Sequence, residues 1–261
     1  MKRSCFTLVE LLVVIAMITF LLAISVSVLR GLRRQAKALG CISNIRQVTL
    51  DLIMYETDNE TFPYGFRDSR DPPLGELVGD PSKDRVGWWW FHLMEGYADT
   101  KKEILHCPSK SLNNPSLSDS ILYGNYGVNR SICKDAGSIQ SQTESAGAPL
   151  CKDEIPQPSR TLLIMDCGYS ITSWWHATDV PPVSLDGTRG VDTAYIPGLA
   201  INEDKQLLPG QERDAIDGRH PNKKVNVAFV DGSVTRMQVD GLFVQKRFDG
   251  YKNKSPLWTP E

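Results

Sequence analysis

The sequence predicts an α+β fold in which one long N-terminal helix packs against an antiparallel sheet. An uncharged apolar run covers residues 11–29, and a one-sided apolar pattern continues from it to about residue 57. Near the C-terminus two strand-like segments flank Asp231-Gly232, which is a strong short-range signal for a β-hairpin. A hairpin implies an antiparallel sheet, and a long helix beside such a sheet gives the α+β class.

Composition and charge narrow the class of protein. The 261 residues include 29 Lys and Arg and 31 Asp and Glu, so the formal net charge is −2. A near-neutral balance provides no basic surface of the kind that duplex nucleic acid requires, so we expect no nucleic-acid partner. Hydrophobic residues make up 41% of the chain and charged residues 23%, values typical of globular domains and not of disordered chains.

The run LLVVIAMITFLLAISVSVL at residues 11–29 is the single segment apolar enough to cross a membrane. In a helix its 19 residues rise about 28 Å, close to the thickness of bilayer hydrocarbon. Lys2 and Arg3 precede the run, and Glu10 lies at its edge. The alternative is a secretory signal peptide, for which residues 23–25 would serve as the cleavage site.

The helix is expected to continue beyond the membrane. Apolar residues recur there at three- and four-residue steps with charged residues between them, as in a helix that buries one face. They are Leu39, Ile42, Ile45, Val48, Leu52 and Tyr55. We predict one helix over residues 6–57, with a transmembrane half at 6–29 and an amphipathic half at 30–57. Pro63 ends it, because proline disfavours helix at the preceding residue.

The rest of the chain divides into two regions. Residues 58–160 are rich in Pro, Gly and Ser and are predicted to form a loop-rich variable region. Residues 161–261 are predicted to hold the antiparallel sheet, beginning with a short apolar strand at 161–165. The C-terminal hairpin joins two alternating segments through Asp231-Gly232, and we expect positive φ at both turn residues.

Residues 6–15, FTLVELLVVI, resemble the N-terminal signature of type IV prepilins and type II secretion pseudopilins at nearly every position. By this resemblance residues 1–5 are a leader peptide, and a prepilin peptidase cuts between Cys5 and Phe6 and methylates the new amine. Cys5 is a departure from the pattern, since the family usually has Gly there. The resemblance also implies that Glu10 pairs with the N-terminal amine of a neighbouring subunit during assembly, because opposite charges satisfy each other in a low dielectric.

A second resemblance covers most of the chain. Arg219-His220 followed by Asp231-Gly232 resembles the C-terminal His…Asp-Gly motif of large prepilin-like families of planctomycete-type bacteria. For this motif we predict a structural role, with His220 hydrogen-bonded to Asp231 or to the backbone near the hairpin turn. Shorter segments that fit the same group lie at residues 41–47, 55–59, 107–109, 123–129 and 158–162.

The two resemblances imply a pilin-like fold and a non-enzymatic subunit of a type II secretion pseudopilus or a type IV pilus-like filament. They imply a single-pass protein of the bacterial inner membrane, with a cytoplasmic N-terminus and a periplasmic globular domain. Its partners would be other pseudopilin subunits, the prepilin peptidase, an assembly ATPase and an inner-membrane platform protein. The ATPase would supply the energy of assembly, in keeping with the lack of a nucleotide-binding motif in the sequence.

An extracytoplasmic domain permits disulfides, although sequence alone does not determine their pairing. We predict a Cys41–Cys107 disulfide, which would tie the long helix to the globular body. A Cys133–Cys151 disulfide would close a Ser- and Gly-rich loop and leave Cys167 unpaired. No cysteine or histidine spacing is typical of zinc, so no metal site is predicted.

Other residues leave two alternative functions open. Trp88 and Trp174 belong to tryptophan clusters that would suit a membrane-anchored module for glycans or another surface, although such clusters more often pack in cores. His220 with an aspartate would suit a tethered hydrolase, but the histidines show no catalytic spacing. Five Asp-Gly pairs leave calcium as the one cofactor to consider, and ordinary turns explain such pairs more simply.

Overall fold

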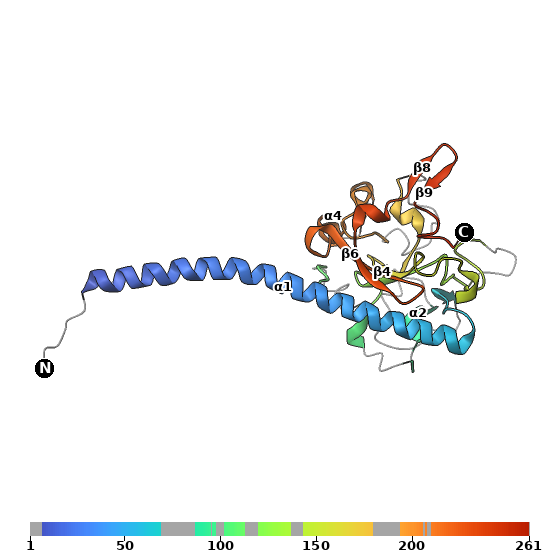
Figure 1. Cartoon of the computed structure of the whole chain (residues 1–261), viewed down its shortest axis with the longest axis horizontal. Coiled ribbons are helices and arrows are strands. Elements are labelled where there is room, and N and C mark those ends of the chain that lie inside the picture. Colours follow the sequence, from blue (N-terminus) through green and yellow to red (C-terminus); the bar gives the residue numbers. More distant parts are fainter. Residues whose placement is uncertain are drawn as a thin grey trace.

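The computed structural model describes residues 7–68, 87–94, 96–97, 102–112, 120–136, 143–179, 194–205, 207 and 210–260. Its first element is the 52-residue helix α1 (Leu8–Asn59). Figure 1 shows the first half of α1 extending away from the body and the second half lying along it. The predicted long helix is therefore confirmed. It ends at Asn59 because the next residue, Glu60, takes a left-handed conformation with φ of 62°.

Five strands form the main sheet in the order β5-β3-β4-β6-β7. They are β3 (Tyr126–Asn129), β4 (Leu162–Asp166), β5 (Ile171–Thr172), β6 (Lys224–Phe229) and β7 (Val234–Gln238). Neighbouring strands run antiparallel except β3 and β5, which are parallel. The α+β class is confirmed, with a sheet that is mostly antiparallel. One of its inner strands, β3, comes from the region predicted to be rich in loops.

The C-terminal hairpin joins β6 to β7 in a continuous antiparallel register. Its turn differs from the prediction, because only Gly232 of the Asp231-Gly232 pair has a positive φ, of 89°. The Gly232 N–H donates to the Phe229 carbonyl at 3.0 Å, and the Phe229 N–H donates to the Ser233 carbonyl at 2.9 Å. This is a type I turn followed by a left-handed residue, for which glycine carries the smallest steric cost.

The sheet has an apolar core on each face. On one face α1 packs against residues that include Ile164, Ala228 and Val230. On the other face Val225 and Val227 pack in a second cluster that includes Leu162, Leu242, Val244 and Trp258. Alternate residues of β6 thus serve the two cores, as the period of two in a strand requires.

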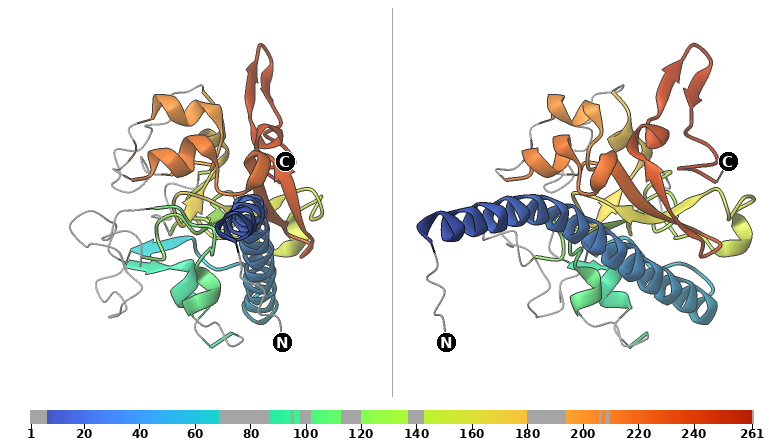
Figure 2. Two further views of the ribbon diagram at one scale, coloured as in Figure 1. Left: turned by 90° about the vertical axis from the view of Figure 1, so that its left-hand side faces the viewer. Right: turned by 60° about the vertical axis from the view of Figure 1, so that its left-hand side comes forward.

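Shorter elements surround the sheet. β1 (Phe66–Asp68) pairs with β2 (Gly87–Trp89), which leads into the single turn of α2 (Trp90–Leu93). β8 (Gln245–Arg247) and β9 (Gly250–Lys252) form a hairpin that projects from the side of the body away from α1 (Figures 1 and 2). Further helices are η1 (Lys102–Leu105), η2 (Lys152–Glu154), η3 (Trp174–Ala177), η5 (Ala200–Asp204), α4 (Glu212–Asp217), η6 (Pro221–Lys223) and η7 (Val239–Leu242).

Replacing Leu52 by Ala is expected to lower the free energy of unfolding by about 2–5 kcal/mol, because this fully buried side chain would leave a cavity against the sheet. Leu50, on the other side of α1, is 51% exposed, so Leu50→Ala should change the free energy by less than about 0.5 kcal/mol. Denaturant unfolding of the full chain in detergent micelles, followed by tryptophan fluorescence, measures both. Equal effects would contradict the placement of α1 on the sheet.

Candidate functional site

The N-terminal half of α1 exposes apolar side chains on all sides. Leu8 is 78% exposed and Phe20 67%, and the most apolar window of the helix contains no buried residue. Within the part of the chain that the structure describes, α1 is the one helix long and apolar enough to cross a membrane. Because a soluble monomer rarely exposes so large an apolar surface, this half needs lipid or protein around it, and it can serve as a membrane anchor.

Glu10 has partners within its own helix. The N–H and the Oγ1–H of Thr7 donate to Glu10 Oε2 at 2.8 and 2.7 Å, and the Glu10 N–H donates to Thr7 Oγ1 at 3.3 Å. This capping box satisfies donors at the first turn of the helix. A carboxylate that accepts two hydrogen bonds is less costly in an apolar environment than one with none. The predicted cleavage residues, Cys5 and Phe6, lie outside the described residues.

The second half of α1 has two apolar faces. The face toward the sheet consists of Ala38, Cys41, Ile45, Val48 and Leu52, all fully buried. Leu32, Leu39, Leu50 and Met54 remain 56%, 61%, 51% and 49% exposed. Their spacings of seven, eleven and four residues are close to whole numbers of helical turns, so they form one stripe on the side of α1 away from the sheet. We call these four residues the outer stripe.

A disulfide fastens α1 to the body. Cys41 and Cys107 are bonded, with their Cα atoms 5.2 Å apart, and both side chains are buried. One turn further along α1, the Asn44 Nδ2–H donates to the His106 carbonyl at 3.0 Å. The Tyr126 hydroxyl on β3 donates to the Cys41 carbonyl at 3.4 Å. The predicted Cys41–Cys107 disulfide is confirmed.

The predicted Cys133–Cys151 disulfide is wrong, because both of these cysteines are free. Their chain segments do lie side by side, since the Leu150 N–H donates to the Ile132 carbonyl at 3.1 Å. The thiol of Cys133 is fully buried, however, whereas Cys151 is partly exposed at the start of η2. Burial raises the pKa of Cys133 and of the third free cysteine, Cys167, which disfavours the reactive thiolate of each.

His220 contacts a different aspartate from the one we predicted. Its Nε2 lies 2.9 Å from Asp166 Oδ2, and the Asn226 N–H donates to the same oxygen at 2.6 Å. The side-chain Nδ2 of Asn226 lies 2.8 Å from the same Nε2, and Nδ1 has no hydrogen-bond partner among the described residues. Asp231 instead stays within the hairpin turn, where its Oδ1 accepts from the N–H and hydroxyl of Ser233 at 2.9 and 2.6 Å.

Arg219 links the same region to α4, to the residue before β3 and to the residue after β4. Its Nη2–H and Nε–H donate to the two oxygens of Asp214 at 2.6 and 3.2 Å. Nη1–H donates to the Asn125 carbonyl at 2.7 Å, and Nη2–H also reaches the Cys167 carbonyl at 3.0 Å. The Tyr195 hydroxyl donates to Asp214 at 2.7 Å. The side chains of Arg219, His220, Asp166 and Asp214 are fully buried, and we call these four the buried polar network.

The charges of Asp214 and Arg219 are stable near neutral pH. Burial by itself raises the pKa of Asp214, but the charge and hydrogen bonds of Arg219, with those of Tyr195 and Ser111, outweigh it and hold the pKa below its usual value. Burial likewise disfavours the charged guanidinium, but Asp214 outweighs it and raises the pKa of Arg219. Burial and the Asp214 charge raise the pKa of Tyr195 well above its usual value. Such groups hold a fixed arrangement of charge and are poorly suited to acid–base catalysis.

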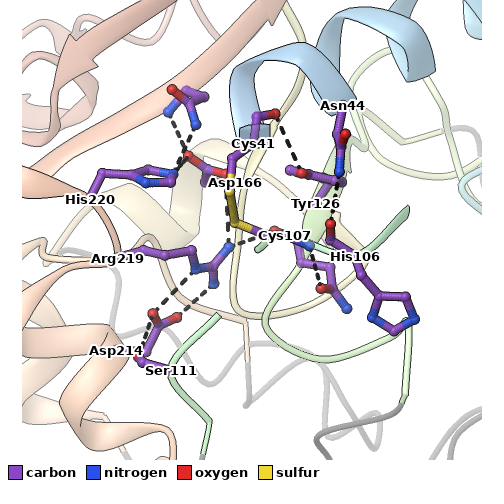
Figure 3. Close-up of a disulfide and its surroundings, with 12 residues drawn as sticks. Cys41, Asn44, His106, Cys107, Ser111, Tyr126, Asp166, Asp214, Arg219 and His220 are labelled. Carbon is purple, nitrogen blue, oxygen red and sulfur yellow. Dashed lines mark hydrogen bonds and ion pairs between the residues drawn. A yellow bond between two sulfur atoms is a disulfide. The ribbon is translucent and has the colours of Figure 1, made fainter. Parts of the chain in front are cut away.

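Three of the segments that carry the second resemblance, 41–47, 107–109 and 123–129, meet beside this network. Figure 3 shows the disulfide, Arg219, His220 and Tyr126 within one close-up. Asn125, from the segment 123–129, accepts the Cys107 N–H at 3.0 Å through its side chain. Sequence reasoning placed His220 in a motif but missed Asp166 and Asp214. Asp166 follows an apolar strand directly, and that position was the signal available for it.

The His…Asp-Gly motif attaches the hairpin to α1 at two points. A ring nitrogen of His220 lies within 4.8 Å of the sulfur of Cys41. At the other end, a Cβ on Gly232 would lie 3.1 Å from Ile53 Cδ1, so the turn itself lies against the helix. The helix between Cys41 and Ile53 rises about 18 Å. The six residues of β6 span about 20 Å, a length close to this rise.

The remaining candidate residues lie apart from this site. Trp174 and Trp175 are only 9% and 8% exposed, and Trp174 packs on Tyr251 with ring centroids 4.7 Å apart. The Asp-Gly pairs at 217, 231 and 249 fall at a helix end or in separate turns, the pair at 240 lies within η7, and the pair at 186 lies outside the described residues. Among the described residues no cluster of three carboxylates is found, so the structure offers no support for a calcium site.

Comparison with known proteins gives no match to a family model, a curated protein or a solved structure.

Replacing Asp214 by Asn should lower the free energy of unfolding at pH 7 by about 3–5 kcal/mol, because Arg219 would lose its buried counter-charge. The lowered pKa of Asp214 means that its contribution is present above the unfolded value near 3.8 and is lost as the pH falls through the folded value below that. Unfolding curves of variant and parent should therefore converge in acid.

The control is Asp217→Asn at the end of the same helix, where the side chain is 70% exposed. It should shift the free energy of unfolding by less than about 1 kcal/mol. A similar loss in both variants would show that the Asp214–Arg219 pair has no special role.

Proposed function

We propose that this chain is a non-enzymatic, membrane-anchored, pilin-like subunit that assembles through α1 into a type II secretion pseudopilus or a type IV pilus-like filament. It would be cut before Phe6 and held in the bacterial inner membrane, with the globular body in the periplasm. The observation that carries the proposal is the 52-residue helix α1, which is exposed and apolar in its first half and keeps an exposed apolar stripe in its second half.

The outer stripe supports assembly over simple anchoring. If residues 8–29 span the bilayer, Leu39 lies about 15 Å beyond it and Met54 about 37 Å beyond it. Lipid does not reach these side chains, yet they are 61% and 49% exposed in the single chain. Helices of other subunits packed along α1 would cover the apolar first half and the outer stripe together, because both lie on one continuous helix.

The capping box at Glu10 supports a role for this carboxylate before assembly as well as during it. In the single chain the donors of Thr7 satisfy Glu10, which lowers the cost of holding the charge in the membrane. In the filament, the methylated amine of a neighbouring Phe6 would compete with Thr7 for the same carboxylate. A charged donor forms the stronger hydrogen bond, so the exchange would favour the assembled state.

The two alternative functions receive less support. A glycan-binding module would need accessible aromatic rings, but Trp174 and Trp175 are nearly buried, and Trp88 is partly buried in β2. A hydrolase would need a histidine that substrate can reach, but the side chain of His220 is fully buried. Within the described part of the chain, no hydroxyl nucleophile is hydrogen-bonded to Nδ1 of His220.

Replacing Leu39 and Met54 together by Gln should reduce filament formation about tenfold or more, because about half of each apolar side chain would no longer be buried by a neighbour. Sheared surface fractions and cross-linked membrane fractions, probed with antibody in the native bacterium, measure the change. The exposed residue Ser43 on the same side of α1 provides the control variant Ser43→Gln. Normal assembly of the double variant, with normal membrane insertion, would refute the proposed role of the outer stripe.

Replacing Glu10 by Ala should leave membrane insertion intact and reduce assembly, because the neighbouring amine would lose its counter-charge. Mass spectrometry of the mature N-terminus separates a processing defect from an assembly defect. Glu203→Ala, at an exposed position of η5, is the matched control and should assemble as the parent does. Charge pairing at Glu10 fails as an explanation if the correctly processed Glu10 variant enters filaments at the parent level.

A further inference from the structure

We propose that Cys41, Cys107 and His220 form a binding site for a thiophilic divalent metal ion, zinc above all, when the disulfide is reduced. The proposal is independent of the filament function. The sulfur atoms and one ring nitrogen of His220 lie within 4.8 Å of one another, and all three side chains are buried. They come from α1, from the loop after η1 and from the segment before β6, so an ion here would join three parts of the fold.

The distances suit zinc after a small adjustment. Zinc binds thiolate sulfur at about 2.3 Å and imidazole nitrogen at about 2.0–2.1 Å, so its donor atoms stand roughly 3.5 Å apart. Breaking the S–S bond frees the two sulfurs to separate toward that spacing. The three protein ligands leave one tetrahedral position for water, as in other zinc sites with three protein ligands.

His220 is held as a metal-ligating histidine is held. Its Nε2 lies 2.9 Å from Asp166 Oδ2 and 2.8 Å from Asn226 Nδ2, and the Asn226 backbone N–H donates to Asp166 Oδ2 at 2.6 Å. The other nitrogen, Nδ1, is buried with no hydrogen-bond partner among the described residues. A carboxylate that binds one ring nitrogen and leaves the other free to coordinate is the usual second partner of a zinc-bound histidine.

The charge of the site favours a dication after reduction. Two thiolates would add two negative charges, and one Zn²⁺ would cancel them. The metal-bound state therefore has the same net charge as the disulfide state, so the surrounding network can remain as it is.

The two states interconvert by ordinary thiol chemistry. A phosphine reductant breaks the S–S bond, the two sulfurs gain two electrons and two protons, and the phosphine becomes its oxide with oxygen from water. Zinc then replaces the two thiol protons, which are released to solvent. Disulfide and metal are thus two alternative ways to hold Cys41, and with it α1, against the body.

The test uses the full chain in detergent micelles, reduced with a phosphine and freed of reductant under anaerobic conditions. Titration with Co²⁺ should produce one equivalent of a thiolate-to-cobalt charge-transfer absorption, and Zn²⁺ should remove it. The oxidised chain should give no such band. Near-ultraviolet circular dichroism follows the fold throughout, and if reduction loosens the fold, zinc should restore the parent spectrum.

Variants assign the ligands. Cys107→Ser should abolish the charge-transfer band, and His220→Gln should weaken cobalt binding at least about tenfold. The matched controls, Cys133→Ser and His106→Gln, should bind as the parent does. The proposal is overturned if the reduced parent gives no band and zinc restores no fold, or if the band survives in Cys107→Ser.

Discussion

The attachment of α1 to the sheet along a single face is the constraint on which the rest of this structure depends. The Cys41–Cys107 disulfide and the buried polar network fix one point of the helix, and the Gly232 turn against Ile53 fixes another. Between them the apolar face of α1 packs on the sheet. With both ends fixed, the helix cannot rotate, so the opposite face is always the one presented outward.

The buried polar network contributes specificity more than net stability. Replacing a buried ion pair by apolar residues is often neutral, whereas removing one partner is costly. Arg219, His220, Asp166 and Asp214 therefore penalise every arrangement in which one of them loses its partner. Because they come from β4, α4 and the segment before β6, this penalty selects one relative placement of those elements. A slipped register of β6 on β4 would separate His220 and Asn226 from Asp166.

The two halves of α1 differ in how much of their surface the body covers. In the first half the described apolar side chains are exposed around the whole circumference, so this half can pack against lipid or against other helices. The second half is fixed on one side and keeps the outer stripe on the other. This arrangement leaves the body attached to a helix whose outer surface can pack against other helices. Under the proposed function, the body would lie on the outside of a filament whose interior consists of such helices.

Much of the architecture follows from patterns that are local in the chain. The period of three to four residues predicted α1, and the alternation around Asp231-Gly232 predicted the β6–β7 hairpin, because both depend on repeating side-chain directions. The strand β3 was missed, since its four residues lie in a Gly- and Asn-rich segment and form a strand only by pairing with β4 and β5. The second disulfide was mispredicted because chain proximity does not tell which way two side chains point.

The amino-acid sequence by itself determined that this protein has an apolar rod at its start, a one-sided helix after it and a hairpin near its end. Those properties reside in the order of side chains along the backbone. Only the tertiary structure decided that His220 pairs with Asp166, that Arg219 pairs with Asp214, and that the disulfide lies beside them. These contacts join residues far apart in the chain, and which partner each charge finds depends on the folding of the sheet that brings them together.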